Sequence, residues 1–145
     1  MGTILGMYRN FQNIKLRDQV PIIIEETKQS LVELNHAQLD EGFNADGIEL
    51  EPYAQSTIAY KKSKGQRFDV TTLKDTGAFR SKWVLEVSKT DITFNSSDSK
   101  TDGLVEKYGY NIFGLTKDSK TTYSLGIFYD RIKKHISEKT GLAFR

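Results

Sequence analysis

Residues 82–94 read KWVLEVSKTDITF, and this stretch decides the fold class. Its two runs, 82–87 and 91–94, are rich in the aromatic and β-branched side chains that favour strands. The polar residues 88–90 between them suit the connection of a hairpin. We therefore expect two antiparallel strands here, and a third strand over residues 104–110.

Helical patterns flank the hairpin on both sides. Residues 18–41 predict a long helix with Asp18 as its N-cap, Pro21 in its first turn and Gly42 at its end. Side chains that step by three and four would form its buried face: Val20, Ile24, Thr27, Leu31, Leu34 and Gln38, widened by Ile23 and Leu39. A second helix of about 18 residues should begin at Asp118 or Ser119, bury Leu125 among others, and stop at Gly141.

This order of elements predicts an α+β fold with an antiparallel sheet and a C-terminal helix packed on it. A chain of 145 residues fits one domain. Within it we expect a flexible arm over 1–15, a core over 16–137 and a tail over 138–145. Residues 95–103 carry no apolar side chain. We expect that loop and the arm to become ordered only against a neighbouring molecule.

The amino-acid composition limits the kinds of chemical site that we expect in this chain. The chain has no cysteine and two histidines, so disulfides, thiolate catalysis and Cys- or His-rich metal sites are not expected. We predict no cofactor and no metal. No segment approaches the roughly 20 apolar residues of a membrane-spanning helix, so we also predict no membrane association.

Asp75-Thr76-Gly77 is the tripeptide found at the catalytic turn of aspartic proteases. A homodimeric protease is therefore one interpretation, but its two carboxylates would need a rigid apolar site. Lys74 precedes the aspartate instead, and the upstream residues Thr71 and Thr72 are polar. The favoured interpretation is a structural turn, in which the Asp and Thr side chains cap the backbone and Gly77 supplies a positive φ.

The wider segment resembles the phage virion morphogenesis, or tail completion, proteins. Five stretches carry the resemblance: GIELEPY at 47–53, STIAYK at 56–61, LKDTGAFRS at 73–81, KYG at 107–109 and NIFGLT at 111–116. It extends over about residues 40–136. It implies a structural virion protein without catalytic residues, which forms a ring at the head–tail junction or the tail end and acts as a neck, tail completion or tail terminator protein. The resemblance implies a hexamer of identical copies, with adjacent neck, connector or tail-tube proteins as further partners. It also implies a location in the virion, which is assembled in the cytoplasm of a bacterial host.

Charge is unevenly distributed along the chain. Residues 25–51 hold eight acids and one base, whereas 52–84 hold seven bases and two acids. Such blocks suit head-to-tail docking of identical subunits. The candidate subunit-interface residues are Glu25, Glu26, Glu33, Arg131, Lys133 and Lys134, together with Trp83 and Phe113, for which burial in the core is the alternative.

A short helix near 56–60 should lead into a basic loop over 61–67. Its cations, Lys61, Lys62, Lys64 and Arg67, could face DNA in a channel. A nucleic-acid-binding module is accordingly the alternative function, ahead of the protease, and a solvated loop is the simplest interpretation of these cations.

Overall fold

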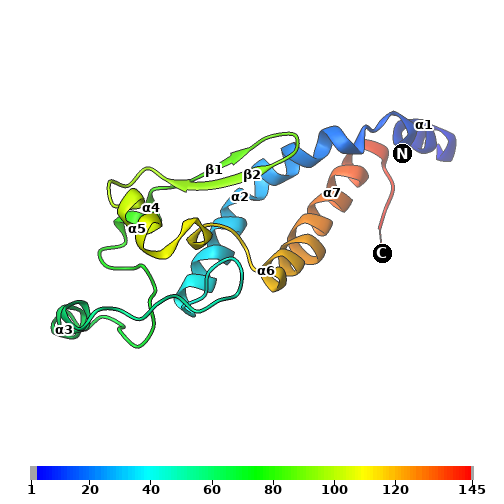
Figure 1. Cartoon of the computed structure of the whole chain (residues 1–145). Helices are drawn as coiled ribbons and strands as arrows, with labels where there is room; N and C mark the ends of the chain where they lie inside the picture. The colour runs from blue at the N-terminus through cyan, green and yellow to red at the C-terminus, as the bar shows by residue number, and fades with distance from the viewer. Residues whose placement is uncertain (1–2, 145) are drawn as a thin grey trace.

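Helix α2 (Leu16–Asp40) runs through the middle of an elongated molecule in the computed structural model, which describes residues 3–144 (Figure 1). The hairpin of β1 (Trp83–Val87) and β2 (Ile92–Ser96) lies along one side of α2. The C-terminal helix lies along another. Helix α1 (Ile4–Asn13) and the end of the C-terminal helix lie at one tip of the molecule, and α3 (Gln55–Ser63) forms the opposite tip. The expected mixed α+β fold with an antiparallel hairpin is confirmed.

The start of α2 differs from the prediction. Lys15, not Asp18, is the N-cap, and Pro21 lies inside the helix rather than in its first turn. Asp18 instead falls in the first turn, where a negative charge interacts favourably with the helix dipole. Gly42 ends the helix as predicted, with a φ of 84°.

The buried face of α2 contains polar side chains, of which Gln38 was predicted by the periodicity and Asn35 was not. Asn35 is 0 % exposed, and its amide donates to the carbonyl of Ile112 (3.2 Å) and accepts from the N–H of Gly114 (2.7 Å). Gln38 repeats the arrangement, donating to the Gly114 carbonyl (3.1 Å) and accepting from the Thr116 N–H (2.8 Å). These four bonds attach the 112–116 segment to α2 where no sheet could satisfy its backbone.

Two apolar clusters fill the space around α2. One gathers Leu39, Leu50, Leu73, Phe79, Ile112 and Phe113 near the hairpin entrance. The other joins α2 to the hairpin and the C-terminal helix through Leu31, Leu85, Leu115 and Tyr123. Within the hairpin, Leu85 lies opposite Phe94.

The predicted third strand is wrong. Residues Thr101–Tyr108 form helix α5, followed by a 3-10 turn, η1 (Tyr110–Ile112). Leu104, Val105 and Tyr108 share a helical face and pack on the first cluster. A short apolar run of this kind fits a buried helix as well as a strand, so the sequence pattern could not distinguish the two.

The polar loop before α5 is ordered within the chain, contrary to the expectation. Asp98 is buried, and its carboxylate accepts from the Lys100 N–H (3.0 Å) and the Lys82 ammonium (3.1 Å). Both contacts lower the pKa of Asp98, the backbone bond most strongly.

The C-terminal helix is longer than expected and is not uniform. It comprises α6 (Lys117–Thr122), a π-helical segment η2 (Tyr123–Phe128) and α7 (Tyr129–Thr140). Thr116 caps it, not Asp118 or Ser119, and Leu125 is 72 % exposed rather than buried. Wider spacing of hydrogen bonds in a π segment shifts the buried face. Gly141 ends the helix as predicted.

Within the predicted arm, residues Ile4–Asn13 form helix α1, capped by the Thr3 hydroxyl. Met7 of this helix lies near Gly141, at the end of α7. The predicted tail likewise begins inside α7, while Met1, Gly2 and Arg145 lie outside the described residues. Across residues 3–144, no helix combines the length and apolarity needed to cross a membrane.

Candidate functional site

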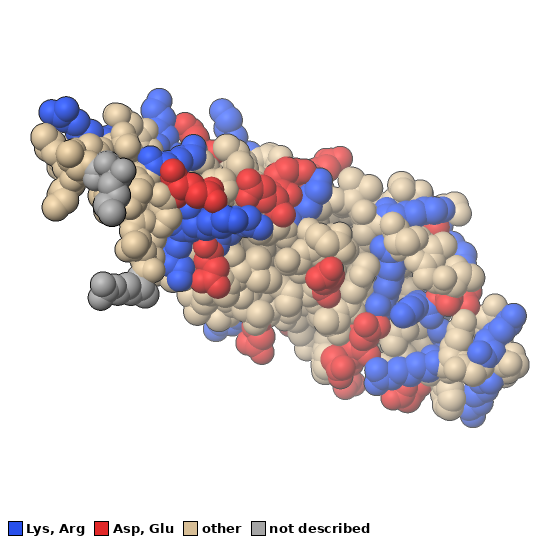
Figure 2. All heavy atoms as spheres, turned by 180° about the vertical axis from the view of Figure 1, so that it is seen from behind, with Lys and Arg blue, Asp and Glu red and all other residues tan. Residues whose placement is uncertain are grey.

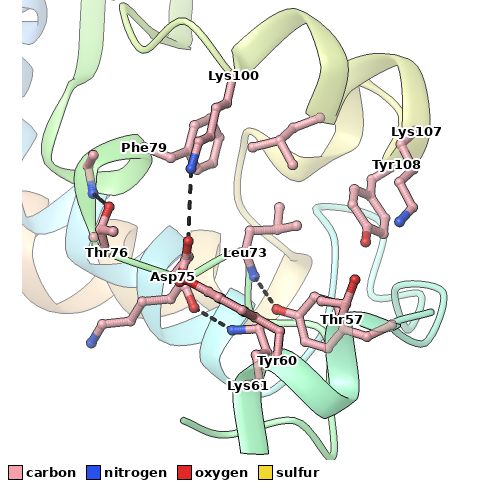
Figure 3. A pocket seen from close by; sticks show the side chains of 15 residues that line it. Thr57, Tyr60, Lys61, Leu73, Asp75, Thr76, Phe79, Lys100, Lys107 and Tyr108 are labelled. Carbon is pink, nitrogen blue, oxygen red and sulfur yellow. Dashed lines mark hydrogen bonds and ion pairs between the residues drawn. The ribbon is translucent and has the colours of Figure 1, made fainter. Parts of the chain in front are cut away.

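A pocket of about 290 Å³ opens beside the Asp75-Thr76-Gly77 turn (Figure 3). One wall comes from α3 with Thr57, Tyr60 and Lys61, and the opposite wall comes from α5 with Lys107 and Tyr108. The turn closes one end, where Phe79 supplies apolar surface. Segments that are 50 residues apart in sequence therefore converge on one concave site, the geometry typical of ligand pockets.

The turn itself differs in detail from the prediction. Gly77 has the predicted positive φ, at 87°, and begins helix α4 (Ala78–Ser81). Thr76 accepts from the Ala78 N–H (3.3 Å), as expected. The Asp75 carboxylate does not cap the turn; it accepts from the Gln66 amide (3.2 Å) and faces the Lys100 ammonium at 3.9 Å.

These surroundings differ from those of a catalytic aspartate. The Asp75 side chain is 37 % exposed and lies beside a cation. A protease dyad instead requires an enclosed apolar site in which two carboxylates share a proton. The arrangement suits ligand binding better than acid–base chemistry.

Lys61 was predicted to lie in a solvated basic loop, and this is wrong. Lys61 and Lys62 belong to α3, and Lys61 is only 4 % exposed. Its ammonium donates to the carbonyl of Lys74 (2.7 Å) and to Gln66 (3.4 Å), and lies 4.9 Å from the centre of the Tyr53 ring. Among the ion pairs of residues 3–144, none includes Lys61. It is a buried cation with neutral oxygen partners and no carboxylate, an unusual arrangement because charges are rarely buried unpaired.

Tyr53 and Lys61 together hold the backbone of residues 72–74 in an unusual conformation. Leu73 has a φ of 53°, a conformation uncommon outside glycine. The Tyr53 hydroxyl accepts from the N–H groups of both Thr72 (3.0 Å) and Leu73 (3.2 Å), while Lys61 binds the carbonyl of the next residue, Lys74. The strained segment is fixed at the edge of the pocket, as strained backbone at binding sites often is.

Further cations surround the opening. Lys74, Lys100 and Lys107 line it together with Lys61, whereas Asp75 is the only carboxylate among its described lining residues. The Lys107 ammonium lies 5.0 Å from the centre of the Tyr108 ring. Lysine and tyrosine thus alternate around a pocket with an apolar base. The sequence analysis did not connect these residues with the turn, because it assigned Lys100 to a polar loop and Lys107 and Tyr108 to a strand.

The other predicted DNA-facing residues lie around the same tip of the molecule. Lys62 lies 4.8 Å from the centre of the Phe68 ring, and Lys64 lies 5.7 Å from that of Tyr60. The Arg67 guanidinium donates to the carboxylate of Asp69 (2.7 Å) and to the carbonyl of Asp40 (2.7 Å). Lys and Arg are prominent at this tip, where Asp and Glu also lie, and both charge signs are present over the middle of the molecule (Figure 2).

Part of the acidic block contacts basic residues of α7 within one chain. Glu26 on α2 lies 3.0 Å from His135 and 3.7 Å from Arg131, both on α7. Antiparallel packing of the two helices brings these side chains together, and Glu26 and Arg131 both stay partly exposed. The remaining candidates have local partners: Lys133 with Asp130, Lys134 with Glu138, Glu25 with Lys28, and Glu33 with Gln29.

Phe113 lies in the core, and the partly buried Trp83 packs against it. Phe113 is 5 % exposed, and the two ring centres are 4.9 Å apart. His36 is half-buried and packs edge-on against Trp83 at 4.6 Å. Burial, and then the charge of Arg80, lower the pKa of His36.

Metal chemistry has no visible basis in the described residues, where no three His, Cys, Asp or Glu side chains cluster as metal ligands would. Comparison with known proteins places the chain in no group. No family model matches the sequence, and neither a curated protein nor a solved structure proved similar to it.

Proposed function

We propose that this chain is a non-catalytic structural subunit of a tailed-phage particle, which assembles head to tail into a ring at the head–tail junction or tail end. The proposal combines the sequence resemblance with one structural observation. Two different uncovered surfaces lie at opposite tips of the molecule (Figure 1).

The first surface is α1. It buries none of its residues, and four large apolar side chains on it are exposed: Ile4 (86 %), Leu5, Tyr8 and Phe11. A helix that leaves apolar residues in water gains stability when a partner covers them.

The second surface is the cationic tip with α3 and the pocket. Because the two surfaces differ in chemistry and lie far apart, one copy cannot cover its own. Contact between unlike surfaces of identical subunits is heterologous, and such contacts close into rings when the rotation permits. Additional partners would be neck, connector or tail-tube proteins.

Mass measurement in solution tests the proposal. We expect the wild-type chain to form a closed oligomer and the Ile4→Glu/Leu5→Glu variant to remain monomeric, because neither side chain packs inside the subunit. Asn10→Glu/Asn13→Glu is the matched control: it adds the same charge to exposed positions of α1 without removing apolar surface. A monomeric wild-type chain, or equal loss of assembly in the control, would contradict the proposal.

A further inference from the structure

We propose that the pocket beside the Asp75-Thr76-Gly77 turn binds a nucleotide unit, an aromatic base carrying a phosphate. The inference does not rest on the ring, since every group involved belongs to one chain. Its main support is the excess of lysine over acidic side chains among the described lining residues, together with a tyrosine ring on each of the two walls.

Charge favours an anionic ligand. Four lysines and one aspartate line the opening, so the site carries an excess of three positive charges. The ammonium of Lys61 has three N–H groups and two oxygen acceptors among the described residues. Lys100 reaches across the pocket toward Asp75 at 3.9 Å, a distance that leaves its ammonium free to contact a ligand as well (Figure 3).

The cation type favours phosphate over carboxylate. Arginine is the residue that recognises carboxylates through paired hydrogen bonds, and none of the described lining residues is an arginine. Lysine acts as a compact point charge and binds phosphate readily. A multiply charged phosphate also matches the charge excess better than a single carboxylate.

The aromatic residues favour a base beside that phosphate. Tyr60 is half-exposed on the α3 wall, Tyr108 lies on the α5 wall, and Leu73 and Phe79 supply apolar surface. Bases stack on tyrosine rings with little dependence on sequence, and neighbouring cations bind the backbone. We place the base against Tyr60 and the phosphate toward Lys100 and Lys107.

The decisive variant is Lys100→Gln/Lys107→Gln. Both lysines are exposed, so the change removes charge without opening the core. Lys134→Gln/Lys139→Gln on α7 is the matched control, with the same change in net charge at the other end of the molecule. Thermal melting of both variants checks that they are folded.

Binding is measured by calorimetry with thymidine monophosphate, a ten-residue thymidine strand and a glutamate-rich peptide. We expect the pocket variant to bind the nucleotide probes about tenfold more weakly and the control to change less than twofold. Asp75→Asn should bind more tightly than wild type because it removes the only negative charge. Equal affinity for monophosphate and strand assigns the site to a free nucleotide; binding of the strand alone assigns it to a unit within single-stranded nucleic acid.

Three outcomes would overturn the inference: no binding of either nucleotide probe, equal loss in the pocket variant and the control, or tighter binding of the acidic peptide. Binding is measured in the monomeric Ile4→Glu/Leu5→Glu background, because a neighbour seated on the cationic tip would cover the pocket. Failure to bind there leaves the mass of the wild-type assembly unaffected, and loss of assembly leaves the lining residues of the pocket unchanged.

Discussion

Replacing Asn35 by leucine tests whether the polar positions of α2 fix the 112–116 segment. Asn35 is fully buried and bonds to the carbonyl of Ile112 and the N–H of Gly114. Leucine has nearly the shape of asparagine, so Asn35→Leu removes the amide without leaving a large cavity. Both backbone groups then remain buried without their partner.

The expected loss follows from these two bonds. Each contributes about 0.5–1.5 kcal/mol, and each unpaired backbone group costs about 1–3 kcal/mol when no water replaces the amide. The added apolar contact of leucine offsets part of this. We expect a net loss of about 2–4 kcal/mol in the free energy of unfolding. For a chain of 145 residues, that corresponds to a decrease in Tm of about 6–12 °C.

Urea and thermal denaturation measure the loss, and Gln29→Leu at an exposed position of the same helix is the control. The double variant Asn35→Leu/Gln38→Leu should lose less than the sum of the single variants, because both side chains hold the same segment. A single variant that melts within about 1 °C of the wild type would refute the reasoning.

Three other predictions concern the turn at Gly77, the half-buried His36 and the ion pair between α2 and α7. Gly77→Val should lower the free energy of unfolding by about 1 kcal/mol or more through its φ of 87° alone, since an added Cβ meets no atom within 4 Å. Asparagine tolerates this conformation, so Gly77→Asn should melt close to the wild type, and equal losses in the two variants would contradict the left-handed turn at Gly77. The pKa of His36 in the folded chain lies below its usual 6.5, so the unfolded chain binds the proton more readily, and the free energy of unfolding should fall as pH decreases through 6.5 toward the folded value. Melting curves between pH 7.5 and 5.5 should show a smaller change of Tm with pH in His36→Gln than in the wild type, and an unchanged dependence would exclude this group. Glu26→Gln should lower the free energy of unfolding by up to about 1 kcal/mol, because it removes a partly exposed contact with α7. Glu33→Gln should have no measurable effect, so chemical denaturation of both variants distinguishes a structural ion pair from a solvated charge.

Local patterns determined much of the architecture. The long helix ending at Gly42, the hairpin between 82 and 96, the positive φ at Gly77 and the stop at Gly141 each depend on residues within a few positions, so sequence alone predicted them. The errors arose where local signals are ambiguous. An apolar run over 104–110 fits either a strand or a helix until its partners are known. The turn before α5 depends on Asp98, which accepts from the backbone N–H of Lys100.

The candidate site depended on tertiary structure almost entirely. The sequence indicated the turn at 75–77 and the lysines near 61, but not that they share a pocket with Lys100, Lys107 and Tyr108. It also could not show that Lys61 is buried or that Glu26 pairs with α7, because both follow from how distant segments pack. Periodicity records which face of a helix is apolar, whereas the partner of each polar group is set only when the chain folds on itself.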